Sequence, residues 1–543
     1  MIEKLKGIKE GMKRKFIAAI MSFALILSST GCQQRAIPEV ASIEDNYRTY
    51  YEVFVYSFYD GNGDGIGDLQ GLTKKLDYIN DGDPATNTDL GCNGIWLMPI
   101  MPSPTYHKYD VTNYYDIDPQ YGTMEDFETF MAACNERGIK VILDLVLNHS
   151  SSEHPWFKEA CSYLRTLGDR APSKEECPYV DYYHFSKEQG SGYCEVPDCE
   201  GWYYEANFYY GMPDLNLNNE EVRAEFEKVM EFWLDKGVGG FRLDAAKEYV
   251  SGSVTSNVEI LSWVNETVKE KREDAYLVAE VWTDRTTYAQ YYASGIDSIF
   301  NFDFADKDGI IVNTVKRMTP ASGYGKLLEE TQELCRSYYP DYIDAPFYTN
   351  HDLGRSTGNY PGEEGEAQTK LSGGLNLLMS GNAFIYYGEE LGMKGAGKDE
   401  NKRAPMYFSK NPDAEGMCDG PADMDKIEMK YDSLEEQEQD QQSIYHYYKE
   451  AIYLRNLYPV IRKGTVENLE EYASDTVAAF SKNYEEETLM IFCNVANEEV
   501  TIDLSGVSGI AEGIENGLYV GEEAATWQDG KLTIPAYGIV FMK

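Results

Sequence analysis

The sequence has little positive charge and no long apolar run. It contains 48 Lys and Arg residues against 92 Asp and Glu residues, which gives a formal net charge of −44. A protein that binds nucleic acid must neutralise phosphates with cations, so no nucleic-acid partner is expected. No apolar run is long enough for a protein that crosses a membrane several times. The acidity is instead typical of solubility outside the cell or of cation binding, because net charge bears on solubility and not on fold.

The sequence also lacks the cysteine spacing of a zinc site and the composition of a disordered chain. Its ten cysteines show no paired C-x2-C pattern, so no zinc is expected. Hydrophobic residues make up 43% of the chain, which provides for a large core. A length of 543 residues predicts about two to four domains. Four cysteines cluster in one polar stretch and could form disulfides, in a pairing that the sequence leaves open: Cys161, Cys177, Cys194 and Cys199.

The N-terminus has the three parts of a secretory signal. The charged stretch Lys13–Lys15 precedes the apolar run Phe16–Leu27, and small residues follow up to Cys32. A Cys directly after a glycine resembles a bacterial lipobox. This implies a lipoprotein signal peptide over residues 1–32, lipidation of Cys32, a polar tether over 33–46, and a position on the outer face of a bacterial cell membrane. The alternative is ordinary signal cleavage and a secreted protein.

Short apolar strands alternate with amphipathic helices through most of the chain, which predicts a (β/α)8 barrel. One helix begins at Thr123, which can form a capping box with Asp126, and another runs from about Glu220 to Lys236. The eight expected strands are Glu52–Tyr56, Gly94–Met98, Lys140–Leu145, Gly239–Leu243, Tyr276–Glu280, Ser298–Phe302, Ala345–Thr349 and Ala383–Tyr387.

Two segments interrupt this alternation. Between His149 and Pro213 lies a Tyr-, Gly- and Cys-rich stretch without helical periodicity, which is typical of a functional loop or an inserted subdomain. From about Gly464 onward, short alternating strands predict an antiparallel sandwich. The expected organisation is a barrel in two parts, at 47–148 and 216–460, with a loop-rich subdomain inserted after the third strand at 149–215 and a C-terminal β-sandwich at 461–543.

Polar side chains follow four of the expected strands at the point where each strand ends, which is where barrel enzymes place their active sites. A single Asp at such a position can be a helix cap, but several carboxylates in one ring are costly to desolvate without a purpose. A carboxylate ring with an arginine favours glycoside hydrolysis, in which one carboxylate attacks and another protonates the leaving oxygen. The residues concerned are Asp144 and His149, Arg242 and Asp244, Glu280, and Asn350, His351 and Asp352.

These four segments resemble the four signature regions of the alpha-amylase family of retaining glycoside hydrolases. The segments Tyr109-Asp110, Met212–Asn216 and Arg403–Met406 match the family as well, and the resemblance covers roughly residues 47–543 in the right order. It implies a barrel enzyme that acts on alpha-glucans and is similar to bacterial alpha-amylase lipoproteins.

The resemblance also implies a role for each matching residue. Asp244 is expected to be the nucleophile, Glu280 the general acid/base, and Asp352 the third carboxylate that grips sugar hydroxyls. Arg242 would hold Asp244 ionised. The other residues expected at the substrate are Tyr109, which would stack beneath the sugar, Asp110, which would support the cleft floor, and His149, Lys247, Asn350 and His351.

A second chemical signal follows the first strand. Oxygen-bearing side chains alternate there with glycines, which suits a hard cation held in a tight loop. The loop is not an EF-hand, because its twelfth position is Gly71 and a strand precedes it. Amylase relatives carry the same loop as a calcium site, which implies Ca²⁺ bound by Asp60, Asn62, Asp64, the Ile66 carbonyl and Asp68. The alternative is a Gly-rich turn with solvated Asp residues.

Three features favour internal α-1,4 cleavage of starch, maltodextrins and maltooligosaccharides. Relatives that cut α-1,6 links often carry Val after the nucleophile and Gln before Pro-Asp-Leu-Asn, where this chain has Ala245 and Met212. Lys247 stands where alpha-amylases reach a glucose on the leaving side.

One departure from the family pattern lies beside Lys247. Glu248 replaces a His that often helps to build a second calcium site, so that site is not expected. The alternatives are an oligo-α-1,6-glucosidase, a maltogenic enzyme or a glucan transglycosylase of the same family, and a non-catalytic glucan-binding lipoprotein. The oligomeric state stays open.

Overall fold

The computed structural model describes residues 40–168, 170–506 and 513–543, and the described residues form one compact unit. The predicted signal peptide, the lipidation site Cys32 and the first part of the tether lie outside the described residues. Within the three described ranges, no helix combines the length and apolarity that crossing a membrane requires.

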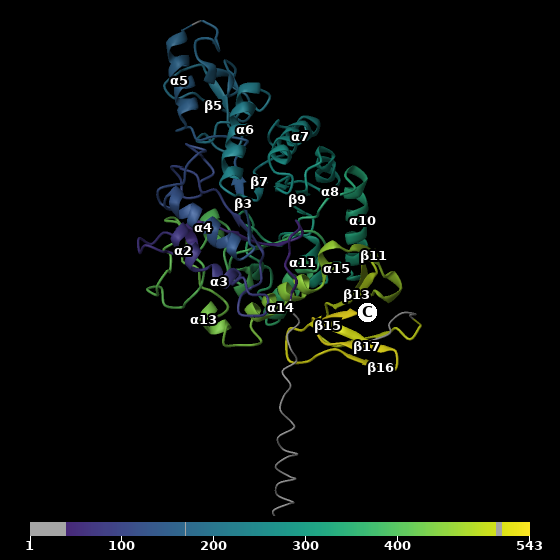
Figure 1. The fold of residues 1–543 in the computed structure, drawn as a ribbon. Helices are drawn as coiled ribbons and strands as arrows, with labels where there is room; N and C mark the ends of the chain where they lie inside the picture. The colour runs from purple at the N-terminus through teal and green to yellow at the C-terminus, as the bar shows by residue number, and fades with distance from the viewer. Residues whose placement is uncertain (1–39, 169, 507–512) are drawn as a thin grey trace, which may run out of the picture. The chain divides into compact units, whose positions relative to one another are not determined.

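The predicted (β/α)8 barrel is confirmed. Seven parallel strands form one sheet in the order β10-β1-β2-β3-β7-β8-β9. Figure 1 labels β3, β7 and β9 of this sheet. Bridges from Phe300 to Ala345 and from Phe347 to Phe384 place the expected strand Ala345–Thr349 between β9 and β10, which closes the ring. The strands are β1 (Thr49–Val53), β2 (Gly94–Leu97), β3 (Lys140–Leu145), β7 (Gly240–Leu243), β8 (Tyr276–Ala279), β9 (Ser298–Ile299) and β10 (Ala383–Tyr386).

The expected position of the first strand is wrong by three residues. We predict Glu52–Tyr56, but β1 spans Thr49–Val53 and is followed by a 3-10 turn, η1 (Val55–Ser57). Nearly every side chain from Thr49 to Phe58 is buried, so the sequence offers no alternation that marks where the strand ends. The pairing of Thr49 with Ala383 and of Tyr50 with Gly94 sets the ends instead.

Aromatic rings fill the interior of the barrel. The ring of Tyr50 lies 5.3 Å from that of Tyr276 and 5.0 Å from that of Phe384. Glycine makes room for this packing and for close strand contact. A Cβ on Gly94 would lie 2.5 Å from the ring of Tyr50, and one on Gly240, whose φ is +145°, would lie 1.9 Å from the carbonyl oxygen of Tyr276.

Helices surround the barrel, and both helices predicted in detail are confirmed. At α4 (Met124–Glu136), Thr123 and Asp126 form the expected reciprocal capping box. At α6 (Glu220–Asp235), the side chain of Asn219 caps the first turn. The other helices outside the inserted segment are α2 (Leu69–Lys74), α3 (Leu76–Ile79), α7 (Val254–Lys271), α8 (Arg285–Tyr288), α9 (Ile310–Val315), α10 (Ser322–Tyr338), α11 (Gly365–Leu377), α12 (Asp399–Lys402), α13 (Leu434–Gln437), α14 (Ile444–Leu457) and α15 (Pro459–Lys463).

The inserted segment after β3 is less irregular than expected. It contains the helix α5 (Pro155–Leu167) and a small sheet in the order β4 (Phe185–Ser186), β6 (Tyr203–Glu205), β5 (Tyr193–Glu195). Buried residues recur along α5 at helical spacing, namely Phe157, Ala160, Cys161, Leu164 and Leu167. The Tyr-, Gly- and Cys-rich composition of the whole stretch obscured this period. All four cysteines of the segment are free thiols.

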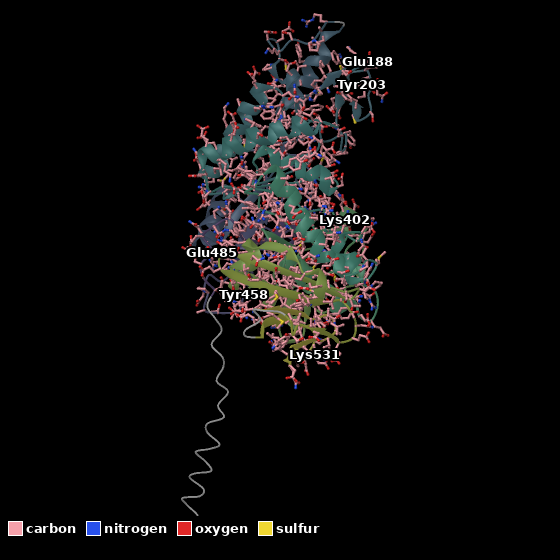
Figure 2. The ribbon with its side chains drawn as sticks, turned by 90° about the vertical axis from the view of Figure 1, so that its right-hand side faces the viewer. Glu188, Tyr203, Lys402, Tyr458, Glu485 and Lys531 are labelled. Atoms are coloured by element: carbon pink, nitrogen blue, oxygen red, sulfur yellow. The ribbon has the colours of Figure 1, made fainter. Side chains whose placement is uncertain are left out.

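The predicted C-terminal antiparallel sandwich is confirmed and occupies the yellow part of the chain in Figure 1. One sheet has the order β11 (Thr465–Asn468), β12 (Val477–Tyr484), β13 (Glu487–Asn494), β18 (Ile539–Met542), β15 (Ile514–Leu518). The other has the order β14 (Val500–Asp503), β17 (Lys531–Ile534), β16 (Thr526–Gln528). Figure 2 marks Glu485, in the turn after β12, and Lys531, at the start of β17. Side chains such as Phe492 and Leu532 are buried in the core of the sandwich.

Candidate active site

The barrel topology brings the expected catalytic residues to one end of the sheet. Asp244 follows β7 directly, Glu280 follows β8 directly, and Asp352 lies three residues beyond the closing segment Ala345–Thr349. Because the strands are parallel, their carboxyl ends meet at the same rim. All three carboxylates therefore face one place, although the stretch of chain from Asp244 to Asp352 is more than 100 residues long.

The guanidinium of Arg242 ties three carboxylates together. Its Nη1 lies 2.6 Å from Asp244 Oδ1 and 2.8 Å from Asp144 Oδ1, and its Nη2 lies 2.7 Å from Glu280 Oε2. Arg242 is completely buried, and its guanidinium carbon stands 5.1 Å from the ring of Trp96. A buried charge requires partners of opposite sign, and this cation has three.

Glu280 is in an environment that raises the pKa of its carboxyl into the neutral range. Burial is the largest cause and raises the pKa of this carboxyl to about 7, and the charges of Asp244 and Asp352 act in the same direction. Arg242 opposes the shift without cancelling it. The backbone N–H of Ala245 also donates to Glu280 Oε2 at 3.1 Å. A carboxylic acid with such a pKa can donate a proton and later accept one.

A second polar chain surrounds His351. Its Nδ1 lies 2.6 Å from Glu52 Oε1, and its Nε2 lies 3.1 Å from Asp352 Oδ2 and 2.7 Å from Tyr109 Oη. Burial disfavours charge on this imidazole, but Asp352 and Glu52 prevail and raise the pKa of His351 to about 9. Burial raises the pKa of the Asp352 carboxyl, but the charges of His351 and Arg403 outweigh burial and hold this pKa well below the usual value. A pKa of about 9 favours the protonated imidazole of His351 at neutral pH, where it contacts the carboxyl groups of Glu52 and Asp352.

Tyr109 connects the hydrogen-bonded residues around His351 to the carboxylates around Arg242. Its hydroxyl contacts His351 Nε2 and lies 3.0 Å from Asp144 Oδ2, and the residue is 8% exposed. The sequence-predicted set Asp244, Glu280, Arg242, Tyr109, His351 and Asp352 is thus one continuous hydrogen-bonded network.

The remaining predicted contacts lie at the edges of this network. His149 is buried with its Nε2 unpartnered. The side-chain oxygen of Asn350 accepts from the backbone N–H of Asp352 at 2.9 Å, so Asn350 positions the third carboxylate. Asp110 accepts from Ser103 Oγ at 2.6 Å and holds the loop that carries Tyr109.

Lys247 lies further from the carboxylates, on the loop after β7. Its ammonium donates to the carbonyl oxygen of Trp282 at 3.3 Å and lies 3.3 Å from Glu248 Oε1. Trp282 follows Glu280 by two residues and is 46% exposed. The side chain of Lys247 is 42% exposed, so it lies at the surface beyond the carboxylates.

Sequence reasoning assigned no role to three residues of the network. Asp144 was noted only as a strand end, Glu52 was treated as part of a strand, and Arg403 only as part of a matching segment. Arg403 Nη2 lies 2.9 Å from Asp352 Oδ1. The available signal was a charged residue in an otherwise apolar strand, as at Glu52 and Asp144, because such a residue is rarely buried without a partner.

The predicted calcium loop is organised by its own carboxylates. Asp60 accepts backbone N–H bonds from Asn62, Gly63 and Gly65 at 2.6–3.1 Å. Asp68 caps α2 and also accepts from the N–H of Gly61. Within the described ranges, no three His, Cys, Asp or Glu residues are grouped so that they alone could hold a metal ion.

The chemistry of the loop nevertheless fits a hard cation. Asp60, Asp64 and Asp68 form no ion pair with any described Lys, Arg or His, although the pKa of Asp68 is raised by burial and then by the charges of the other two. All donors that the loop offers are oxygens, including the amide oxygen of Asn62 and the carbonyl of Ile66. A cation there would depend on these neutral oxygens as well as on the carboxylates.

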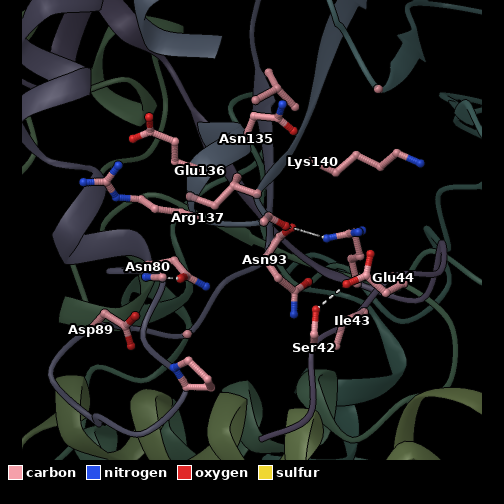
Figure 3. Close-up of a pocket in the computed structure, with 18 of the residues that line it drawn as sticks. Ser42, Ile43, Glu44, Asn80, Asp89, Asn93, Asn135, Glu136, Arg137 and Lys140 are labelled. Atoms are coloured by element: carbon pink, nitrogen blue, oxygen red, sulfur yellow. Dashed lines mark hydrogen bonds between the residues drawn. The ribbon is translucent and has the colours of Figure 1, made fainter. Parts of the chain in front are cut away.

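A groove of about 920 Å³ lies at the other end of the barrel (Figure 3). Asn93, Lys140 and Gly239, which line it, stand at the N-terminal ends of β2, β3 and β7. Some of its charged side chains are paired, as Lys236 is with Glu128 and Arg137 with Asp77. In barrels of this kind the N-terminal face serves stability and the C-terminal face serves chemistry, so the groove is not the catalytic site.

Comparisons with known proteins agree with this geometry. The family model for the alpha amylase catalytic domain matches residues 52–464. Alpha-amylase 3 of Dictyoglomus thermophilum is 36% identical over 496 residues, covering 91% of this chain and 92% of the relative. The oligo-1,6-glucosidase of Heyndrickxia coagulans is 30% identical, covering 83% of this chain and 92% of that protein.

A solved structure is similar over nearly the whole chain. It is that of Eubacterium rectale Amy13B, with a TM-score of 0.88 and 48% sequence identity, covering 94% of this chain and 97% of that one. With the family model matched and the carboxylates assembled at the barrel rim, the chain belongs to the alpha-amylase family and is a glycoside hydrolase.

Proposed function

We propose that the enzyme hydrolyses internal α-1,4-glucosidic bonds of starch and maltooligosaccharides with retention of configuration. The observation that carries the proposal is the single guanidinium of Arg242, which contacts Asp244 at 2.6 Å and Glu280 at 2.7 Å. Retaining enzymes hold their two carboxyl groups about 5–5.5 Å apart, which leaves no room for a water between nucleophile and sugar. Two carboxylates on one guanidinium are held close in this way.

In the proposed first step, Asp244 attacks the anomeric carbon while Glu280 gives its proton to the leaving oxygen. The glycosidic C–O bond breaks and a glycosyl ester forms on Asp244. In the second step Glu280 takes a proton from water, the water oxygen attacks the anomeric carbon, and the ester bond electrons return to Asp244. Arg242 holds the nucleophile charged, and Asp352, His351 and His149 bind sugar hydroxyls above the ring of Tyr109.

Three residues support α-1,4 over α-1,6 cleavage. Ala245 follows the nucleophile, Met212 precedes Pro-Asp-Leu-Asn, and the ammonium of Lys247 lies at the exposed rim, where it can donate to a hydroxyl beyond the cut. The similarity to alpha-amylase 3 agrees with this reading. The similarity to an oligo-1,6-glucosidase, and Glu248 in place of His, make α-1,6 action the second candidate.

Product analysis on starch, maltoheptaose and isomaltose tests the linkage. We expect rapid loss of iodine colour from starch, a rise of kcat/KM with chain length because binding energy is spread over several sugar units, and no attack on isomaltose. Proton NMR of the first products should show the α-anomer. Cleavage of isomaltose with starch left intact would establish the α-1,6 alternative, and an initial β-anomer would contradict retention.

A pH profile tests the role of Glu280. Because Glu280 must be protonated to act as an acid and its pKa is about 7, kcat/KM for maltoheptaose should fall as pH rises through about 7. Maltosyl fluoride needs little proton donation to its leaving group, so its alkaline decline should be much weaker. Glu280→Gln should lose at least about 100-fold on maltoheptaose and much less on the fluoride. The same alkaline decline for both substrates would assign it to another group.

We also propose that Ca²⁺ binds the Asp60–Asp68 loop, supported by its all-oxygen donor set and by carboxylates that accept backbone N–H bonds but form no ion pair. A cation that binds only the folded state stabilises it by about 2.7 kcal/mol at 100 times its Kd. A chelator should therefore lower the Tm measured by calorimetry. Asp64→Ala should abolish this sensitivity, whereas Asp308→Ala, at an exposed Asp just before α9, should keep it. If neither calcium nor the chelator changes the Tm of the wild type, the loop is a turn that binds no calcium.

Finally, we propose that lipid on Cys32 holds the enzyme at the outer face of a bacterial membrane. The support is the charged stretch, short apolar run and terminal Gly-Cys of residues 13–32. Cell fractionation should find the wild type with the membrane and Cys32→Ser in the medium. Wild-type protein that is entirely in the medium would favour ordinary signal cleavage.

A further inference from the structure

Glu52 is a charged residue inside the barrel that the proposed mechanism does not use. It lies in β1 between Tyr51 and Val53, both completely buried, and is itself 1% exposed. A carboxylate in such a place is costly unless it has a partner of opposite charge. The partner is the imidazole of His351, whose Nδ1 lies 2.6 Å from Glu52 Oε1. Glu52 therefore acts on the active site through His351.

The partners of His351 are arranged so that both ring nitrogens donate. At Nδ1 the partner is the carboxylate of Glu52, which can only accept when it is ionised. At Nε2 the partners are Asp352 Oδ2 at 3.1 Å and Tyr109 Oη at 2.7 Å. Asp352 is also an acceptor at neutral pH, because the pKa of its carboxyl is held low.

The hydroxyl of Tyr109 is the one partner that could donate to His351 instead, but its single proton points elsewhere. It donates to Asp144 Oδ2 at 3.0 Å. Asp144 is the acceptor in this bond, because its two oxygens also accept from Arg242 Nη1 at 2.8 and 2.9 Å. The oxygen of Tyr109 is left to accept from His351. A neutral imidazole would therefore face a carboxylate with an unprotonated nitrogen.

Charges on several elements bear on the protonation of His351. Burial disfavours the charged imidazole, but Asp352 and then Glu52 outweigh burial and raise the pKa of His351 to about 9. The titratable and charged groups that act on His351 or on its two carboxylate partners are Glu52 on β1, Tyr109 after β2, Asp144 on β3, Arg242 on β7, Asp352 beside His351, and Arg403 at the end of α12.

We propose that Glu52 is a positioning residue that keeps His351 protonated on both ring nitrogens and thereby holds Asp352 in place for the sugar. The inference rests on the proposed function, in which His351 and Asp352 bind sugar hydroxyls. Without the negative charge of Glu52, the imidazole would lose a proton at a lower pH. Once unprotonated, Nε2 would repel the Asp352 carboxylate instead of donating to it. Glu52 would thus set the upper pH limit of the working cleft.

Maltosyl fluoride isolates this effect from Glu280, because it needs little proton donation to its leaving group. In the wild type, kcat/KM for the fluoride should hold to about pH 9 and fall as His351 loses its proton. Glu52→Gln keeps the size of the side chain and removes its charge, so the midpoint of this decline should move down by about 1–3 pH units. Glu52→Asp keeps the charge, and its midpoint should lie closer to that of the wild type. An unchanged midpoint in Glu52→Gln, or equal shifts in the two variants, would overturn the proposal.

Glu390→Gln is the matched control. Glu390 is completely buried, and its carboxyl accepts from the hydroxyls of Tyr51, the residue before Glu52, and of Tyr78. It exchanges one buried carboxyl for an amide next to β1 but outside the hydrogen bonds of His351, so the midpoint should not move. If Glu390→Gln shifts the midpoint as far as Glu52→Gln does, repacking of a buried site explains the shift and the proposal falls.

The protonation of His351 can also be measured without any substrate. The chain has six His residues, so NMR of protein labelled with ¹³C-histidine gives few ring signals, and the signal missing in His351→Gln is the one to follow. It should titrate near pH 9 in the wild type and about 1–3 units lower in Glu52→Gln. A wild-type midpoint near the ordinary value of about 6.5 would overturn the proposal even if Glu52→Gln does not fold. A lower NMR midpoint in Glu52→Gln with an unchanged activity midpoint would overturn the role in holding Asp352.

The two measurements separate this proposal from the proposed function. If the wild type cleaves neither maltoheptaose nor the fluoride, the proposed function falls, and the NMR titration still decides whether Glu52 keeps His351 protonated. If the wild type cleaves both substrates and His351 titrates at the same pH with and without the charge of Glu52, the proposed function stands and the role of Glu52 falls.

Discussion

The buried guanidinium of Arg242 is the interaction on which the catalytic end of this protein depends. Moving one cation and several carboxylates out of water is costly, and the cost is offset only when each charge has close partners of opposite sign. Arg242 has three such partners at 2.6–2.8 Å. Burial alone would weaken its hold on a proton, but these neighbours raise its pKa well above the usual value. The cation is therefore permanent, and the carboxylates are arranged around it.

Burial and the neighbouring charges give the carboxyl groups at this rim different pKa values. Glu280 shares its guanidinium with Asp144 and Asp244, so the attraction does not cancel the effect of burial, and its pKa rises to about 7. Asp352 instead lies between two cationic groups, His351 and Arg403, and its pKa falls. Two carboxyl groups at one rim thus differ in protonation because their numbers of cationic neighbours differ. A carboxyl group with a pKa near 7 can exchange a proton near neutral pH, whereas one with a lowered pKa stays charged.

Beyond the carboxylates, the cleft is bounded by loops whose positions are fixed by buried polar groups. Asn148 and Asp214 join the end of β3 to the inserted segment, and Asn207 continues this connection to the exposed rings of Phe208 to Tyr210. The inserted segment therefore has two parts: a root that buried polar contacts join to the barrel, and an aromatic surface that is exposed to solvent. Rigid support of this kind lets an exposed loop present side chains in a defined place.

The barrel and the sandwich could be predicted from the sequence alone, because buried parallel strands appear as short apolar runs. The polar residues that follow these runs could be placed at one rim in the same way, but the roles expected of Asp244, Glu280 and Asp352 came from the resemblance to the alpha-amylase family. The capping box at Thr123 was equally local, since it needs only residues three apart. The ends of β1 and the helix α5 were not found, because continuous burial and an unusual composition hid their periods.

Only the tertiary structure decided which charges meet. Glu52 and His351 are 299 residues apart and lie 2.6 Å from each other, and Arg403 reaches Asp352 from a segment 51 residues away. The hydrophobic pattern of a sequence predicts which face of an element a residue lies on. It does not predict which distant polar group forms a hydrogen bond or ion pair with a given buried polar side chain. A buried charge must find its partner in space, and that pairing, with the pKa values that follow from it, exists only once the barrel has closed.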